Sequence, residues 1–210
     1  MNIYGVPTSL VVRWILEREN VRGWLDVACG DGRFLEQIGF TPKEGLGIDI
    51  CENPMLPCGF EFEHADVVTW TTDKYFDFVS MFQIVEYLPK DESMKLITKY
   101  LFMAKSILIG TPSGFMREDN ENPYLSHRCG FTPQEFEDMG FLVFSFKNYH
   151  LRPDLTPKSY DDLLAYRGTI DHGKLKRTVF IRSVAYNLNP LHLYRTLRQY
   201  KRHYIIQRAH

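Results

Sequence analysis

The stretch Trp24-Leu-Asp-Val-Ala-Cys-Gly-Asp-Gly-Arg-Phe-Leu-Glu36 decides the fold of this 210-residue chain. A short apolar run carries the acidic Asp26, and a tight turn through Gly30 and Gly32 leads into helical spacing. Glycine lets a ligand lie against bare backbone, because it has no Cβ and tolerates a positive φ. The helix that follows presents unpaired N–H groups to the polar end of that ligand. The stretch therefore predicts a strand, a turn and a helix that bind a nucleotide-type cofactor.

Two other glycine motifs are excluded by the sequence. The dinucleotide fingerprint needs a third glycine where this chain has Leu35, and the phosphate-loop pattern G-x-x-x-x-G-K-[ST] does not occur. An NAD-dependent oxidoreductase is therefore a weak alternative.

Apolar strands alternate with amphipathic helices along most of the chain. This order is typical of a parallel α/β sheet covered on both faces, in which ligands bind outside the carboxyl ends of the strands. We expect helices over residues 9–19, 32–38 and 91–101, the last with Asp91 as N-cap, and a further helix that begins at Thr132 and ends at Gly140. The expected strands are residues 24–28, 46–50, 60–67, 76–82, 106–110, 141–146 and 178–184.

The glycine-turn stretch resembles motif I of the class I S-adenosylmethionine-dependent methyltransferases. Further segments match that family in order. Tyr75-Phe-Asp-Phe-Val79 and Gln83-Ile-Val-Glu-Tyr-Leu-Pro89 are similar to its "FDxV … VxEHxP" region. The segment from Thr111 to about Phe146 is similar to the "TPNG … NPxxxHxxxWTPEEL … GF" region of small-molecule and glycan members of the methyltransferase 11/23 type. The chain departs from the family at Tyr87, where His is frequent, and at Phe131, where Trp is frequent.

The resemblance implies a Rossmann-like class I methyltransferase, with a mostly parallel seven-stranded sheet between helices. It implies S-adenosylmethionine as cofactor and S-adenosylhomocysteine as product. Asp49 ends the second strand, where a carboxylate can accept hydrogen bonds from ribose hydroxyls or be a solvated loop acid. In the family, Asp66 meets the adenine amino group and the backbone of Val67 lies nearby. The expected cofactor-binding residues are Asp26, Ala28, Cys29, Gly30, Gly32, Asp49, Ile50, Asp66, Val67 and Gln83.

Methyl transfer asks the protein mainly to align acceptor, methyl and leaving sulfur. A hydroxyl acceptor also needs a base, for which His127 is the first candidate and Glu86 and Tyr87 are the second. Each has a structural alternative: His127 ties down its loop, and Glu86 packs against or caps the next helix. An amine, thiolate or carboxylate acceptor needs no base.

We expect the acceptor to be a small molecule, a sugar or a lipid-linked intermediate, methylated by in-line displacement. The alternative is a cofactor-binding but inactive family member that acts as a binding or regulatory subunit. The four cysteines show no C-x-x-C pair and no metal-ligand spacing, so we expect reduced thiols, no metal and a cytoplasmic protein. Residues 6–16 lack a basic leader, so no signal peptide is expected.

Charge divides the chain unevenly. All 26 acidic residues precede Lys174, whereas nine lysines and arginines lie from Lys174 to His210. We therefore divide the chain into a methyltransferase domain, residues 1–186, and a basic amphipathic C-terminal helix, residues 187–210. That helix could pack on the acidic body, contact a membrane surface peripherally, bind RNA or bind a partner helix. The acidic body argues against nucleic acid as the substrate.

Overall fold

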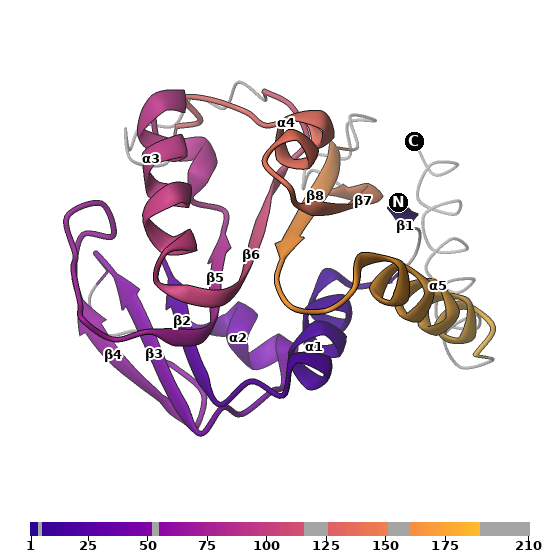
Figure 1. Ribbon diagram of the computed structural model, residues 1–210, viewed down its shortest axis with the longest axis horizontal. Coiled ribbons are helices and arrows are strands. Elements are labelled where there is room, and N and C mark those ends of the chain that lie inside the picture. The colour runs from indigo at the N-terminus through magenta and orange to yellow at the C-terminus, as the bar shows by residue number, and fades with distance from the viewer. Residues whose placement is uncertain (4–5, 52–54, 116–125, 151–159, 190–210) are drawn as a thin grey trace, which may run out of the picture.

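The computed structural model describes residues 1–3, 6–51, 55–115, 126–150 and 160–189. They form one eight-stranded sheet with helices on both faces (Figure 1). The strands are β1 (Asn2–Ile3), β2 (Gly23–Val27), β3 (Glu44–Asp49), β4 (Phe60–His64), β5 (Phe76–Phe82), β6 (Ala104–Pro112), β7 (Leu142–His150) and β8 (Tyr160–Arg167). The helices are α1 (Thr8–Glu19), α2 (Arg33–Ile38), α3 (Lys90–Leu101), α4 (Pro133–Asp138), α5 (His172–Asn187) and the short 3₁₀ helix η1 (Val85–Tyr87).

The sheet has the order β1-β7-β8-β6-β5-β2-β3-β4, and only β8 runs against its neighbours. The central strands are parallel, with Asp26 opposite Ser80 of β5 and Gly47 of β3. The carboxyl ends of β2, β3, β5 and β6 therefore lie along one edge. Because β8 is reversed, its first residues lie at that same edge, where Asp162 is opposite Pro112.

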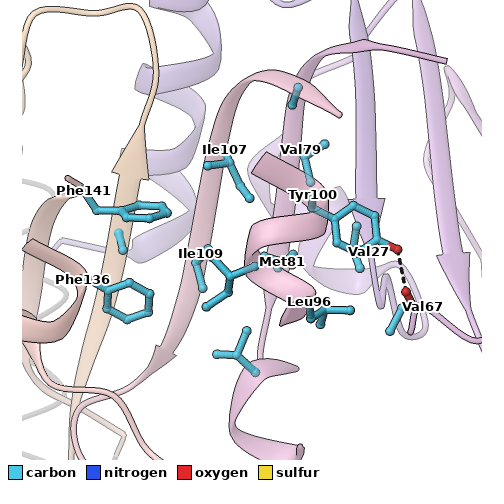
Figure 2. Close-up of a cluster of buried hydrophobic side chains, with 14 of the residues drawn as sticks. Val27, Val67, Val79, Met81, Leu96, Tyr100, Ile107, Ile109, Phe136 and Phe141 are labelled. Atoms are coloured by element: carbon cyan, nitrogen blue, oxygen red, sulfur yellow. Dashed lines mark hydrogen bonds between the residues drawn. The ribbon is translucent and has the colours of Figure 1, made fainter. Parts of the chain in front are cut away.

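Two apolar layers flank the sheet, because successive strand residues point to opposite faces. Val79 and Met81 of β5 pack under α3, in the layer that Figure 2 shows, whereas Phe78, which precedes Val79, packs in the other layer with α1, α2 and α5. Tyr100 of α3 is fully buried, and its hydroxyl donates to the carbonyl of Val67 at 2.9 Å. Removing a side chain such as buried Leu96 costs about 2–5 kcal/mol in sites of this kind.

The α/β class and the mostly parallel sheet predicted from the sequence are confirmed, but the predicted seventh strand is wrong. Residues 178–184 lie inside α5. Their β-branched and aromatic run favours a strand locally, yet Leu175 and Val179, four positions apart, are buried against the body, so tertiary packing overrides propensity. The seventh and eighth strands are β8 and the two-residue β1, which pattern alone did not indicate. The strand β8 has two consecutive aspartates, Asp161 and Asp162, near its start, and aspartate is a residue type that occurs rarely in strands.

Helix boundaries follow local capping. Thr132 and Glu135 form the predicted capping box, with the backbone N–H of Thr132 donating to Glu135 Oε2 at 2.7 Å. The prediction of Asp91 as N-cap is wrong: α3 begins at Lys90 after Pro89, and Asp91 lies in its first turn. Proline fixes the φ that precedes the helix, so it can stand where a capping side chain otherwise would.

Most of the predicted C-terminal helix lies outside the described residues. Of the predicted segment 187–210, the structure describes only 187–189, and α5 ends at Asn187, one residue past the predicted division. Among the helices that the structure describes, none is long and apolar enough to cross a bilayer.

Candidate functional site

The glycine turn after β2 has the backbone that the sequence predicts. Ala28, Gly30 and Gly32 all have positive φ, at 60°, 56° and 82°. A Cβ on Gly32 would lie 2.4 Å from the carbonyl oxygen of Met55, so no other residue fits there without a backbone shift. A Cβ on Gly30 would meet nothing within 4 Å. Gly32 therefore closes the turn against the chain, whereas Gly30 faces open space.

Asp49, at the end of β3, ties this turn to the sheet edge. Its Oδ2 accepts the backbone N–H of Gly30 at 2.7 Å, and its Oδ1 accepts that of Cys51 at 2.7 Å. The residue is only 6% exposed. Both oxygens thus have a fixed orientation and keep further lone pairs for a ligand.

Asp26 is a second buried carboxylate, inside β2. Ser80 donates its hydroxyl to Asp26 Oδ1, and Trp24 Nε1 donates to that hydroxyl oxygen at 2.6 Å. Burial raises the pKa of Asp26 to about 7, and the charge of Asp49 adds to the increase against the lowering effect of the Ser80 bond. The carboxyl group therefore changes its charge near neutral pH.

One cavity of about 1180 Å³ opens at this edge of the sheet. It collects side chains and backbone from the ends of β2, β3, β5, β6 and β8. Of the predicted site residues, those that line it are Asp26, Ala28, Cys29, Gly30, Asp49, Ile50, Asp66, Val67, Gln83 and Tyr87. Gly32, Glu86 and His127 do not line it.

Residues 66–68 form a fixed turn at one end of the cavity. Asp66 Oδ1 accepts the backbone N–H of Val68 at 2.8 Å. The Val67 carbonyl accepts both the Tyr100 hydroxyl and Lys99 Nζ, the latter at 3.1 Å. Val67 itself is 6% exposed, so it presents a small apolar surface beside a carboxylate.

The remaining lining residues give little scope for nucleophilic chemistry. Burial raises the pKa of the Cys29 thiol, and the charge of Asp26 adds to that shift, so the thiol stays neutral.

Gln83 follows β5 with a φ of 52°, and its N–H donates to the Gly110 carbonyl at 2.8 Å. In the described part of the chain, no group of three His, Cys, Asp or Glu side chains could hold a metal ion.

The three predicted catalytic residues lie together, but only Tyr87 reaches the cavity. The rings of Tyr87 and His127 meet edge to face, with centroids 5.0 Å apart. Glu86 is 1% exposed; its Oε2 accepts the Thr111 hydroxyl at 3.0 Å, and its carbonyl accepts the N–H of Arg128 at 2.8 Å. Glu86 therefore holds the loop that carries His127, and the His127 ring packs against the Tyr87 ring.

Sequence reasoning missed part of the cavity wall. Asp162, at the start of β8, is 6% exposed and lines the cavity with Leu163 and Thr111. Nothing in the local sequence marks Asp162, because β8 itself was not predicted. Arg128 also lines the cavity, and its place beside His127 in the matched loop was the available signal.

Two other polar residues are structural. Asp77 Oδ2 accepts the backbone N–H groups of Gly23 at 2.9 Å and Arg22 at 3.0 Å, bonds that lower the pKa of that carboxyl. His64 Nε2 lies 2.9 Å from the carbonyl of Ile50. These contacts give both side chains a place in the local structure outside the cavity lining.

Solved structures place the fold in a known class. No protein-family model matches the chain, and no curated protein sequence matches it. The N-methyltransferase NodS from Bradyrhizobium japonicum WM9 aligns with a TM-score of 0.54 at 15% identity, over 75% of this chain and 91% of that chain. The N-terminal domain of EvdMO1, solved in the presence of S-adenosylhomocysteine and D-fucose, aligns with a TM-score of 0.55 at 14% identity, over 77% and 82%.

The small RNA methyltransferase HEN1 aligns with a TM-score of 0.51 at 12% identity, over 77% of this chain and 25% of that chain. At these identities the likeness concerns the fold. The chain has the Rossmann-like class I fold of S-adenosylmethionine-dependent methyltransferases, as the sequence predicts.

Proposed function

We propose that this protein is an S-adenosylmethionine-dependent methyltransferase that modifies a small-molecule, sugar or lipid-linked acceptor. The observation that carries the proposal is the Asp49–Gly30 contact in the lining of a large cavity, which also reaches Tyr87. A carboxylate held against a glycine turn suits the ribose and amino-acid parts of a nucleoside cofactor. The fold and the names of the aligned proteins support the same reading.

The cavity residues fit the cofactor by chemistry. Asp49 offers oriented oxygens for two ribose hydroxyls, and Gly30 leaves its surroundings open to the amino-acid part. Ile50 and Val67 offer apolar surface for an adenine ring, and Asp66 offers a carboxylate for its amino group. The remaining cofactor-binding residues of the proposal are Asp26, Ala28, Cys29, Gly32 and Gln83, with Gly32 acting through the shape of the turn.

When bound, the cofactor supplies an activated methyl group on a positively charged sulfur. The chain's own residues then have to hold the acceptor in line and exclude water, which is worth about 7–11 kcal/mol in well-oriented reactions. The buried carboxylate Asp49 favours a cationic ligand in this low-dielectric site, and Asp26 does so when it is ionised. Sequence and geometry together suggest that Tyr87 orients the acceptor, with His127 and Glu86 supporting it or taking up its proton.

The size of the cavity leaves room for an acceptor beside the cofactor. A cavity of about 1180 Å³ exceeds the roughly 300–1000 Å³ of a typical single-ligand pocket. Because Asp49 is proposed to hold the ribose, the nucleoside occupies the part of the cavity at the end of β3. The acceptor then occupies the part at the ends of β5, β6 and β8. The charged lining residues there and throughout the described cavity are mostly acidic, which disfavours a polyanion such as nucleic acid; these residues are Asp26, Asp31, Asp49, Asp66, Glu92, Arg128 and Asp162.

A transfer assay tests the proposal. The purified chain is incubated with S-adenosylmethionine carrying a labelled methyl group and, in separate reactions, with amine, sugar and lipid-linked acceptor pools. We expect label to enter at least one pool with wild-type protein and to be lost with Asp49→Ala. Cofactor binding without transfer to any pool would favour the inactive binding subunit instead. Transfer to RNA alone would overturn the assignment of the acceptor.

A further inference from the structure

The helix α5 carries apolar side chains on two opposite sides, and only one side is buried. Leu175 and Val179 face α1 and are 1% and 0% exposed. The opposite side presents a row, here named the outward row, that consists of Phe180, Ile181 and Val184 and of the C-cap residue Leu188, which are 59%, 54%, 41% and 74% exposed. Because a helix repeats every 3.6 residues, positions 180, 184 and 188 align along the axis. A helix on a domain surface needs one apolar side, so the second side indicates a partner.

Polar contacts fix which side faces the body. Arg182 Nη1 lies 3.3 Å from Glu17 Oε2 of α1, and its guanidinium lies over the Trp14 ring. Arg18 of α1 donates to the Thr178 hydroxyl at 3.3 Å. These contacts hold α5 on α1 and keep the outward row turned away from the body. Figure 1 shows α5 beside α1, at the end of the molecule opposite β3 and β4.

The charges around the outward row are positive. Lys174, Lys176 and Arg177 are exposed in the first two turns of α5. From residue 172 to 210 the sequence contains nine lysines and arginines and no acidic residue. Any partner of this face therefore has to supply both an apolar surface and negative charge.

This requirement selects among possible partners. A second copy in a two-fold contact would bring the same cations against each other. Residues 190–210 would bring five more cations and no acid. An anionic lipid surface supplies acyl chains for the large apolar side chains and headgroup charge for the lysines and arginines. We propose that the outward row of α5 docks this protein peripherally on an anionic membrane.

Docking in this way leaves the cavity accessible. The antiparallel strand β8 places Asp162 at the cavity edge and its last residue, Arg167, at the opposite edge of the sheet. The helix α5 follows that opposite end. Membrane docking is thus independent of the proposed methyl transfer, and either can fail without the other.

Vesicle sedimentation tests the proposal with the full chain. One set of vesicles contains phosphatidylcholine and phosphatidylglycerol in equal parts, and the other contains phosphatidylcholine alone. We expect the wild type to sediment with the anionic set. The double variant Phe180→Ser, Leu188→Ser should lower the partition coefficient at least about tenfold. The variant Lys176→Gln, which removes one positive charge, should lower it about fivefold, since each cation near such a surface contributes about 1 kcal/mol.

The matched control is Phe102→Ser, which removes an aromatic side chain that is 81% exposed outside α5. It should sediment as the wild type does. Far-UV circular dichroism and thermal unfolding should be unchanged in all variants, because the replaced side chains are exposed. Equal sedimentation of the double variant and the wild type, or no sedimentation of the wild type with anionic vesicles, would overturn the proposal. So would a dimer in size-exclusion chromatography that the double variant abolishes.

Discussion

The two halves of the cavity are built differently. The half at β2 and β3 consists of short loops that follow their strands directly, with the Gly30 turn bonded to Asp49 through backbone N–H groups. The half at β5, β6 and β8 brings together Tyr87, against which His127 packs, and Asp162, residues that are far apart in the sequence. The first half is fixed by local backbone geometry, and the second by tertiary packing. This difference indicates that cofactor binding and acceptor choice can be changed separately.

The largest expected effect comes from the turn of the first half. Gly32→Ala should destabilise the fold by about 3 kcal/mol or more, because its Cβ would meet the Met55 carbonyl at 2.4 Å and its φ is positive. The matched variant Gly30→Ala meets nothing and should cost only about 1–2 kcal/mol for its φ. Denaturant unfolding of both variants measures the difference. Equal stability of the two would show that the close approach at Gly32 does not exist in solution.

The second half is tested by His127→Ala. We expect turnover to fall about 10²-fold or more if His127 takes up the proton, while cofactor affinity is unchanged. A His127→Phe variant keeps the ring that packs against Tyr87 and separates the two roles. Recovery of turnover in His127→Phe would assign the residue to positioning, and full activity in His127→Ala would remove it from the mechanism.

If the two halves bind different ligands, variants of Asp49 and Asp162 should affect different steps. One should change cofactor affinity and the other the KM for the acceptor. Asp49→Ala should weaken cofactor binding by about 1–3 kcal/mol, because it removes a buried hydrogen-bonding partner. Asp162→Asn should leave that affinity unchanged and raise the KM for the acceptor. Titration and steady-state kinetics on both variants distinguish them. Weaker cofactor binding in Asp162→Asn would show that Asp162 also contributes to cofactor binding, so that the two halves do not act separately.

The last expected effect concerns pH. The folded pKa of Asp26, about 7, lies above the unfolded value of about 3.9, so the folded state binds the extra proton and this group's contribution to stability falls as pH rises from about 4 to 7. Asp26→Asn removes the ionisation and should be more stable than the wild type at pH 8, by on the order of 1–3 kcal/mol, and equal to it near pH 4. Unfolding curves against pH measure this, and parallel curves for the two proteins would contradict the assigned ionisation.

The same contrast explains what could be predicted from the sequence. The glycine turn and the capping box at Thr132 depend on a few neighbouring residues, and the structure confirms both. Asp49 and Asp66 line the cavity, and their roles in cofactor binding stay predictions. The strand β8 starts with aspartates and depends on pairing with β6 and β7, and α5 depends on packing against α1. Local patterns do not contain these contacts, so β8 was missed, residues 178–184 were assigned as a strand and Asp162 was overlooked.

Calorimetric titration of the purified chain tests the central claim most directly. S-Adenosylmethionine, S-adenosylhomocysteine and NAD are titrated in parallel, with Asp73→Asn as a control that changes an exposed acid outside the cavity. We expect micromolar binding of the first two ligands to the wild type and to the control, markedly weaker binding to Asp49→Ala, and no binding of NAD. Binding of NAD, or no binding of either S-adenosyl ligand, would contradict the account.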